Sequence, residues 1–494
     1  MQLVAYGAQD IYLTGNPQIT FFKVVYRRHT NFSMESIVQT FSGSADFGNE
    51  VVATISRNGD LVGRMYLEHS CTFTHGTQND DSDLGLVERY GDSLIKECEI
   101  EIGGQRIDKH TSMWNRVYSD LTEFNPTGYF GPKTAGSTGV SAGNGTLYQL
   151  MTGNHIGVNT EASAGDDDFG VNSSSIIVNG FNYNMTNANI VVNNIFLPLN
   201  FWFNRNPGLA LPLIALQYHE VKVKMTFESL GNLVRTTQTA NFANAVPATV
   251  AGVASLQKPT PTMNLWCDYI YLDTDERRRF AQVSHEYLIE QLQYSDNTIT
   301  SASPSIDLNF NHPVKELVWT MRNTTGGVTG GRHTTLTADE GDPTSGPVSI
   351  DRMGGNFQLK LNGHDRFKER DSKYFTRTQV WQHHTGYGGI PTEGIHANDA
   401  IPDTAVPLGG DSIAVYSFAL KPEEHQPSGT CNFSRIDNAQ LVGSSLKVSY
   451  SGNTFDKTIA ETASNIATVT LTIYAVNYNV LRIMSGMGGL AYSN

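Results

Sequence analysis

The sequence has few charged residues. Asp, Glu, Lys and Arg make up 17% of its 494 residues, well below the roughly 25% of an average soluble domain. This composition excludes a coiled coil and a disordered acidic or basic tail. Acidic residues exceed basic ones, 48 against 34, and the formal net charge is −14. Because proteins that follow phosphates normally carry a basic surface, we expect no direct nucleic-acid binding.

Cysteine is scarce and scattered. Cys71, Cys98, Cys267 and Cys431 lie far apart, and none forms a C-x-x-C pair. A disulfide framework needs clustered cysteines, and a zinc site needs closely spaced ligands. We therefore expect four buried free thiols in a reducing compartment.

Long hydrophobic runs and known signals are also lacking. The longest apolar stretches, 195–203 and 209–216, are interrupted by proline or a polar residue, whereas a membrane span needs roughly 20 apolar residues. No basic segment precedes an apolar one near residue 1, so we expect no signal peptide. The motifs G-x-S-x-G, H-E-x-x-H and G-x-x-x-x-G-K-S/T are absent too. We expect neither an enzyme nor a cofactor site.

Turn formers and aromatic residues are abundant instead, with 46 glycines and 10% aromatic residues. Together with the low charge, they favour an all-β protein with many turns. Residues 95–102 alternate between glutamates and apolar residues, which predicts a half-buried strand ending at a Gly103-Gly104 turn. Asn58-Gly59 predicts a hairpin. Residues 110–124 have apolar residues on one helical face and are the best helix candidate.

Strand-like runs recur in both halves of the sequence. They include 61–73, 195–203, 265–272, 314–321, 432–441 and 446–450. Segments rich in small polar residues at about 126–192, 229–262 and 383–412 are too long for ordinary connections, so we interpret them as loop insertions. The resulting division is an N-terminal arm at 1–27, a first domain at 28–273, a linker at 274–284 and a second domain at 285–494.

The two halves show a faint internal duplication, in the same order along the chain. Residues 55–62 are similar to 308–315, 99–105 to 358–364, 207–208 to 427–429, and 265–272 to 471–478. Each match is weak alone, but their common order predicts two similar β-domains in tandem. About eight strands per half fit a jelly roll. The predicted fold is therefore an all-β double jelly roll, two tandem eight-stranded antiparallel sandwiches with long loop insertions and few short helices.

Four longer phrases carry a resemblance to a known family. They are LVAYGAQDIYLTGNPQITFFKVVYRRHTNFSMES at 3–36, PGLALPLIALQYHEVKV at 207–223, PSGTCNFSRIDNA at 427–439 and NYNVLRIMSGMGGLAYSN at 477–494. In these phrases the chain closely resembles the major capsid proteins of nucleocytoplasmic large DNA viruses, nearest to the algal, chlorella-virus-like phycodnavirus branch. The resemblance spans the chain from end to end and follows the family's order.

The resemblance implies a structural role in the virion. It implies homotrimers with a pseudo-hexagonal outline that tile the icosahedral outer shell of a large double-stranded DNA virus, assembled in the host cytoplasm. It also implies minor capsid proteins beneath the shell as partners, and an internal viral membrane as an indirect one. The long loops would then form outer towers, and residues 1–27 would pack beneath the barrels.

Six Asn-x-Ser/Thr sequons are present. Those in predicted loops, which are candidates for N-linked glycans, are Asn144, Asn172, Asn184 and Asn323. Asn31 and Asn432 lie in the family-like phrases near strands, and we expect them to be unmodified.

Metal sites are not expected. His383-His384 with His396 lies in a Gly-rich segment, and we interpret these histidines as surface residues. The acidic groups at 80–83 and 166–168 lack the ligand spacing of a calcium loop. The apolar segment 483–494 would be an exposed patch if it were free, so we expect it to pack on its own barrel or at a subunit contact.

Two alternatives remain open from the sequence. One is a secreted carbohydrate-binding β-sandwich or a glycosidase, which a signal peptide and a cleft with paired carboxylates or aromatic residues would favour. The other is a minor vertex or spike protein on the same fold, which a very low copy number in the particle would favour.

Overall fold

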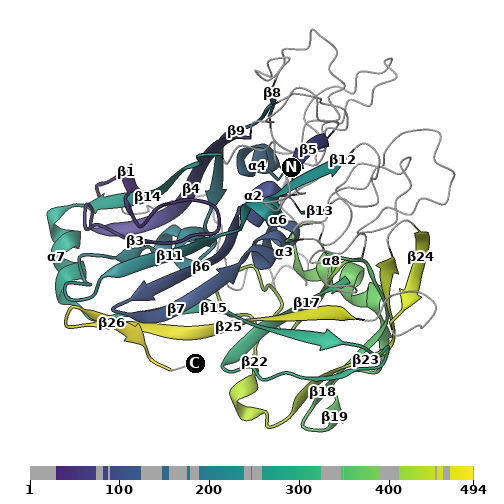
Figure 1. The fold of residues 1–494 in the computed structure, drawn as a ribbon. Helices are drawn as coiled ribbons and strands as arrows, with labels where there is room; N and C mark the ends of the chain where they lie inside the picture. Colours follow the sequence, from purple (N-terminus) through teal and green to yellow (C-terminus); the bar gives the residue numbers. More distant parts are fainter. Residues whose placement is uncertain are drawn as a thin grey trace, which may run out of the picture.

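The computed structural model describes residues 29–73, 82–86, 89–123, 147–154, 175–177, 189–238, 246–247, 259–323, 347–348, 350–386, 388, 411–450, 453–459 and 468–492. The predicted arm at 1–27 and most of the predicted insertion at 126–192 lie outside these residues. Within the described part, two β-sandwiches stand side by side, one at the upper left and the other at the lower right of Figure 1.

The first sandwich packs a front sheet on a back sheet. The front sheet has the order β1 (Phe32–Gln39), β14 (Thr262–Leu272), β4 (Leu61–Phe73), β9 (Asn189–Pro198) and β8 (Ser175–Ile177), with β10 (Leu211–Pro212) beside β4. The back sheet has the order β2 (Phe41–Ser42), β3 (Glu50–Thr54), β11 (Val221–Phe227), β6 (Ile95–Ile102) and β7 (Gln105–Thr111). A small separate sheet contains β13 (Val246–Pro247), β12 (Val234–Gln238) and β5 (Ser82–Leu86).

The second sandwich is built in the same way. Its front sheet has the order β15 (His285–Ile299), β25 (Val469–Met484), β17 (Pro313–Asn323) and β21 (Ile413–Ser417), with β22 (Cys431–Asn432) beside β17 and β26 (Met487–Leu490) beside β25. Its back sheet has the order β16 (Ser305–Asp307), β23 (Ala439–Tyr450), β18 (Met353–Leu361) and β19 (His364–Asp365), with β20 (Arg370–Asp371) beside β18 and β24 (Asn453–Thr458) beside β23. Each sandwich has its own hydrophobic core.

The two sandwiches have equivalent topology, so the predicted double jelly roll is confirmed. The front sheet β1-β14-β4-β9 corresponds in chain order to β15-β25-β17-β21, and the back sheet β3-β11-β6-β7 corresponds to β16-β23-β18-β19. The sequence matches fall on equivalent elements: β6 and β18, β14 and β25, and the segments that lead into β4 and β17 or precede β11 and β23. The internal sequence duplication therefore corresponds to two structurally equivalent domains.

Strand β6 shows how local sequence produces this architecture. Its apolar residues Cys98, Ile100 and Ile102 are buried, while the glutamates between them are partly exposed. The strand ends at Gly103 and Gly104, whose φ angles of 59° and 82° are the left-handed values that glycine adopts without steric cost. Both the strand and its turn were predicted correctly.

Three local predictions were wrong. Asn58-Gly59 does not form a hairpin, because β3 and β4 belong to different sheets and the segment crosses between them. Glycine is needed there for close approach: a Cβ on Gly59 would lie 2.9 Å from Cβ of Tyr269. The predicted strand 195–203 ends at Pro198 and is followed by helix α5 (Trp202–Arg205). The two strands predicted at 432–441 and 446–450 are mostly one strand, β23.

The longer helices begin at side-chain caps. Helix α3 (Ser112–Thr122) confirms the predicted helix, and its first turn is capped by Thr111, whose Oγ1 accepts a hydrogen bond from the Trp114 N–H at 3.3 Å. The segment predicted as a linker is largely helix α7 (Thr274–Gln282), because Asp273 caps the N–H of Glu276 at 2.9 Å. The other short helices are α2 (Tyr90–Leu94), α4 (Leu147–Thr152), α6 (Leu230–Leu233), α8 (Gln379–His383), η1 (Pro207–Leu209), η4 (Tyr374–Thr378) and η5 (Phe433–Arg435). In the described residues no helix is both long and apolar enough to cross a membrane.

The C-terminal segment packs on its own barrel, one of the two predicted alternatives, and also contacts the first jelly roll. Strand β26 pairs with β25 in the second front sheet. The Tyr218 N–H, from the first jelly roll, donates to the Gly486 carbonyl at 2.9 Å. All four cysteines are free thiols, but only Cys71, Cys98 and Cys267 are buried, whereas Cys431 is half-buried.

Candidate functional site: the contact between the jelly rolls and the outer sheet faces

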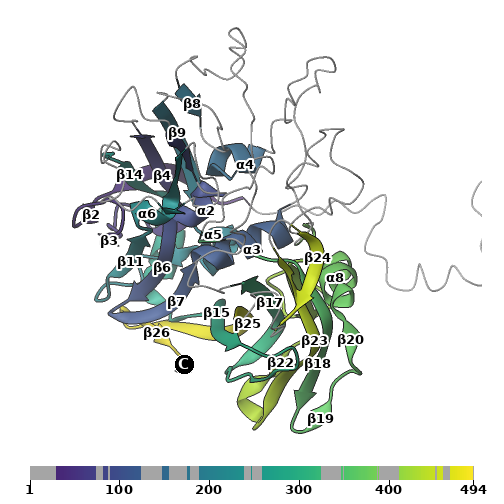
Figure 2. The ribbon, with the colours of Figure 1, turned by 45° about the vertical axis from the view of Figure 1, so that its right-hand side comes forward.

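Helix α3 of the first jelly roll lies on the outer face of the second front sheet (Figure 2). Its buried residues Trp114, Val117 and Leu121 pack with Val318 of β17 and Tyr474 of β25. The ring centroids of Trp114 and Tyr474 are 5.1 Å apart. Because β17 and β25 have their other face in the core of the second jelly roll, both faces of this front sheet are covered.

The C-terminal end of α3 is also bonded to the second jelly roll. The Gly386 N–H donates to the Leu121 carbonyl at 2.8 Å, and the Gly388 N–H donates to the Asp120 carbonyl at 2.7 Å. The Thr385 hydroxyl donates to the Thr122 carbonyl at 2.9 Å. The last carbonyls of a helix have no partner within it, so the segment after α8 supplies the partners that α3 lacks.

A buried charge cluster lies in the same contact. Glu290 of β15 forms ion pairs with Arg205 of the first jelly roll, at 2.8 Å from Nη2, and with Lys315 of β17, at 2.9 Å from Nζ. Burial alone would raise the pKa of Glu290, but Arg205 and Lys315 outweigh it and hold the pKa well below its usual range. The Arg205 guanidinium also lies over the Tyr118 ring, 5.4 Å from its centroid. Arg205 thus joins the two jelly rolls through its charge, and its stacking on Tyr118 is a contact within the first jelly roll.

A second buried cluster surrounds His384. Its Nε2 lies 3.0 Å from Glu316 and its Nδ1 lies 3.1 Å from Glu423. Burial alone would lower the pKa of His384, but the two carboxylates raise it to about 9. The imidazole is therefore a cation at neutral pH. The prediction that His383-His384 are surface residues is wrong for His384, because its neighbours on β17 and after β21 enclose the ring.

Strand β7 completes the contact by meeting β15. The Leu292 N–H donates to Asp108 Oδ1 at 3.0 Å, and Gln291 Nε2 donates to the Ile107 carbonyl. The other Asp108 oxygen lies 3.1 Å from His110 Nε2. A cavity of about 30 Å³ remains among these polar groups, which is enough for a buried water. Separating the jelly rolls would leave several buried charges unpaired, so this contact fixes their relative orientation.

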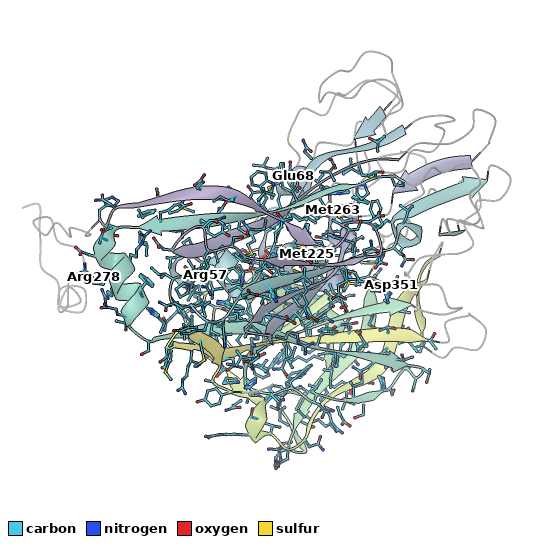
Figure 3. All side chains as sticks on the ribbon, turned by 60° about the vertical axis from the view of Figure 1, so that its left-hand side comes forward. Arg57, Glu68, Met225, Met263, Arg278 and Asp351 are labelled. Carbon is cyan, nitrogen blue, oxygen red and sulfur yellow. The ribbon has the colours of Figure 1, made fainter. Side chains whose placement is uncertain are left out.

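The outer face of the first front sheet is only partly covered, because Leu61 and Ile270 pack with Ala210 and Phe280 while the edge strand β1 is exposed. On β1, Phe32, Met34 and Val38 are 56%, 55% and 46% exposed. Beside them the Tyr66 and Trp266 rings stack with centroids 6.5 Å apart. Figure 3 shows Glu68 of β4 toward this outer side and Met225 of β11 inside the first jelly roll. In the described part of the chain, the outer face of the second front sheet is thus covered by α3, whereas the outer face of the first front sheet carries exposed apolar side chains on β1.

The sequons are placed as follows. Asn144, Asn172 and Asn184 lie outside the described residues. Asn323 was expected in a loop but is the last residue of β17, where it pairs with Val469. Strand β17 extends two residues beyond its predicted end at Met321, through the polar residues Arg322 and Asn323. Asn432 is exposed, and its side chain caps η5 by accepting from the Ser434 N–H at 3.1 Å.

The other histidines and acidic groups, at which no metal site was expected, are described only in part. His383 Nδ1 faces the Leu420 carbonyl at 3.2 Å, and Asp83 of the group 80–83 lies in β5, where it pairs with Thr237. His396, Asp80, Asp81 and the group 166–168 lie outside the described residues. Among the residues that the structure describes, no group of three or more His, Cys, Asp or Glu side chains is arranged to hold a metal ion.

Comparison with known families decides the identity of the chain. Residues 20–273 match the family described as "Major capsid protein N-terminus". Residues 276–398 and 401–489 match "Large eukaryotic DNA virus major capsid protein". The chain belongs to the major capsid proteins of large eukaryotic DNA viruses. This result confirms the resemblance and favours it over the carbohydrate-binding and glycosidase alternatives.

Individual capsid proteins match over the whole chain. The chain is 46% identical over 499 residues to the major capsid protein of Pyramimonas orientalis virus, covering 100% of the chain and 99% of the relative. It is 41% identical over 521 residues to that of Paramecium bursaria Chlorella virus 1, with the same coverage. Both relatives agree with the algal-virus branch that the sequence phrases indicated.

Solved structures support the fold. A chain of the "PBCV-1 virus capsid, quasi-atomic model" matches with a TM-score of 0.65 and 38% identity, covering 96% of this chain and all of that one. The Faustovirus major capsid protein matches with a TM-score of 0.60 at 13% identity, covering 97% and 94% of the two chains. At 13% identity, the match to the Faustovirus protein supports a shared fold and nothing more.

Sequence reasoning missed the residues that join the jelly rolls. Glu290, Lys315 and Glu316 lie on strands whose outer face contacts the other domain, and no spacing rule identifies such a partner. One sequence feature could have indicated them: ionisable residues within otherwise apolar strands, such as Lys315-Glu316 between Val314 and Leu317. Such residues are rarely fully buried unless they are paired.

Proposed function

We propose that the chain is a structural capsid subunit that assembles into pseudo-hexagonal homotrimers, and that these trimers tile an icosahedral shell. The observation that carries the proposal is the contact between the jelly rolls. It joins β7 and α3 of one jelly roll to the outer front-sheet face of the next, so the two partners contribute different surfaces. Such a contact is heterologous, and repetition of it closes a ring when the rotation allows.

The composition of the ring follows from the duplication. Each chain contributes two equivalent jelly rolls, so a ring of six contains three chains. The contact within the chain would alternate with a similar contact between chains. This arrangement produces a nearly sixfold outline from one gene product, which suits a flat lattice. The proposed activity is self-association by burial of surface, without a chemical reaction or a cofactor.

The native mass of the purified protein tests the proposal. We expect a species of about three times 54.2 kDa with a hexagonal outline in negative stain. A monodisperse monomer would contradict the trimeric capsomer. Copy number in purified particles separates a major shell subunit from a minor vertex or spike protein, because only the former is present in great excess.

Further partners belong to the same proposal. We assign the subunit to the outer shell of the virion, assembled in the host cytoplasm, with minor capsid proteins beneath it, the internal membrane as an indirect partner and no direct contact with nucleic acid. N-linked glycans are proposed at Asn144, Asn172, Asn184 and Asn323. Peptide mass spectrometry of protein from particles tests each asparagine, and unmodified peptides at all four would refute the assignment.

A further inference from the structure

We propose that the helical segment 372–383 of one copy docks on the outer face of the first front sheet of a second copy, as α3 docks on the second front sheet within the chain. The inference rests on the proposed function and deepens it, because it names the two surfaces that join one chain to the next. The occupant of each surface is a second copy of this chain.

The two helical segments occupy equivalent positions in their jelly rolls. Helix α3 follows β7, and the segment 372–383 follows β20. Each begins at a serine preceded by a capping residue: Thr111 accepts from the Trp114 N–H at 3.3 Å, and Asp371 accepts from the Lys373 N–H at 2.9 Å. The two segments are therefore copies of one element in the duplicated fold.

The docking stripe of α3 has a counterpart in the second segment. Counted from Ser112, the residues of α3 that face the other jelly roll are Trp114, Tyr118 and Leu121. Counted in the same way from Ser372, the counterparts are Tyr374, Thr378 and Trp381. The α3 stripe follows the i, i+4, i+7 spacing of one α-helix face. The second segment has a π-helical turn at Tyr374–Thr378, and Tyr374 packs against the core of its own jelly roll, so Trp381 of α8 carries the comparison.

The two stripes differ sharply in burial. Trp114 and Leu121 are 5% and 2% exposed, whereas Trp381 is 80% exposed. Leu420, whose carbonyl faces His383 Nδ1 at 3.2 Å, is 76% exposed beside it. Tryptophan is enriched among the residues that dominate binding energy at interfaces. Trp381 is exposed two residues before His383, which contacts the backbone of the exposed Leu420, and it has the character of an interface residue.

The receiving faces are equivalent too. In the second front sheet, Leu292 of β15 pairs with Val476 of β25, and both pack under α3. In the first front sheet, Met34 of β1 pairs with Ile270 of β14. The duplication matches Leu265 to Leu471, which brings Ile270 to the position of Val476 and Met34 to that of Leu292. Where Leu292 is covered by a helix, Met34 remains 55% exposed.

The two open surfaces cannot meet within one chain. Strand β1 lies at the edge of the first jelly roll that is far from the second, whereas α8 lies beside α3 on the second jelly roll (Figure 1). A head-to-tail contact with another copy satisfies both at once. Exposed apolar patches of this kind mark protein interaction sites.

Three glutamate variants test the proposal by native mass spectrometry at concentrations where the wild type is trimeric. Trp381→Glu and Met34→Glu are expected to yield monomers, because each places a charge in the proposed contact. Met487→Glu is the matched control, since Met487 is 51% exposed on β26, away from both surfaces, and it is expected to remain trimeric. Far-UV circular dichroism and thermal unfolding should show that all three variants keep the fold.

A mixture of the two defective variants makes the test specific for a head-to-tail contact. The Trp381→Glu copy keeps an intact sheet face, and the Met34→Glu copy keeps an intact helix. At high concentration the mixture should therefore form dimers that cannot close into a ring. If Trp381→Glu loses its fold, Leu420→Glu probes the same surface with the same expected loss of trimers.

The outcomes separate the two proposals. Trimers of wild-type stability from both Trp381→Glu and Met34→Glu would overturn this inference and leave the trimeric function standing. Dissociation of the Met487→Glu control, or a mixture that stays monomeric, would also overturn it. A wild type that is itself monomeric would instead remove the proposed trimer.

Discussion

The His384 Nε2 atom lies 3.0 Å from the Glu316 carboxylate, and both side chains are almost excluded from solvent, at 2% and 7% exposure. Glu316 belongs to β17, while His384 follows α8, so the pair ties the helical segment of the second jelly roll to its front sheet. Glu423 holds the other ring nitrogen at 3.1 Å. The ring is therefore fixed as an imidazolium between two carboxylates.

This pair predicts a loss of stability at alkaline pH. The pKa of His384 is about 9 in the folded chain, against 6.5 for an ordinary histidine. Because folding raises the pKa of His384, the protonated imidazole stabilises the fold fully below pH 6.5. This stabilisation is lost as the pH rises through about 9 and the ring loses its proton. One pKa unit corresponds to about 1.4 kcal/mol, so the free energy of unfolding should fall by roughly 2–3 kcal/mol across this window.

Chemical denaturation of wild type and His384→Gln between pH 6.5 and 9.5 checks the prediction. The variant should be less stable at pH 6.5 and nearly independent of pH above it. His383→Gln is the control, because His383 faces only a backbone carbonyl and should retain the wild-type slope. An unchanged slope in His384→Gln would assign the pH dependence to other groups.

Removal of the Glu290 charge predicts a large loss of stability. Glu290→Gln leaves Arg205 and Lys315 without their buried carboxylate, and breaking a buried ion pair from one side costs about 3–5 kcal/mol. Glu286→Gln on the same strand is the control, since its pair with Arg482 is 59% and 50% exposed and exposed pairs contribute about 0–1 kcal/mol. Equal midpoints of urea unfolding for the two variants would be incompatible with the buried cluster.

Much of the fold was accessible from local sequence. The alternation in 95–102 predicted β6 residue for residue, and the duplication predicted the equivalence of β14 with β25. These features depend on a period of two or on internal similarity, which the sequence shows directly. The helix at α3 was also found, because its apolar face and its cap at Thr111 are both local signals.

Features set by distant contacts were not accessible. Asn58-Gly59 has the composition of a hairpin turn, yet contact with Tyr269 of β14 requires the glycine, and the chain crosses between sheets there. The same limit applies to the candidate site. Nothing near Glu290 in the sequence indicates that Arg205, on the other jelly roll, is its partner. Ion pairs between domains depend on how the domains pack, which no local pattern encodes.

Gly386 should not tolerate a side chain. A Cβ at this position would lie 2.4 Å from the Asp120 carbonyl oxygen at the end of α3. Gly386→Ala must therefore push the two jelly rolls apart locally and weaken the bond from the Gly386 N–H to the Leu121 carbonyl. Overpacking of this kind typically costs about 1–3 kcal/mol.

Thermal unfolding of Gly386→Ala against Gly489→Ala checks this prediction. In the control variant the nearest neighbour of the new Cβ is the flexible Gln105 amide oxygen at 3.4 Å, an ordinary contact. The first variant should unfold several degrees lower, and the second should resemble wild type. A wild-type melting temperature for Gly386→Ala would show that the segment after α8 can move away from α3 without loss.

Truncation of Trp114 and truncation of Trp381, one on each helical segment, should affect different properties of the protein. Trp114→Ala empties a packed site between α3 and Tyr474, and truncation of a buried Trp costs about 3–5 kcal/mol. It should lower the stability of the subunit itself, measured by urea unfolding of the dissociated chain. Trp381→Ala removes a ring that is 80% exposed in the subunit, so it should leave that unfolding curve within about 0.5 kcal/mol of wild type. Its effect should appear instead as a higher protein concentration required for trimers in sedimentation equilibrium. If Trp381→Ala destabilised the subunit as strongly as Trp114→Ala, the ring would be part of the internal core and not of a contact between copies.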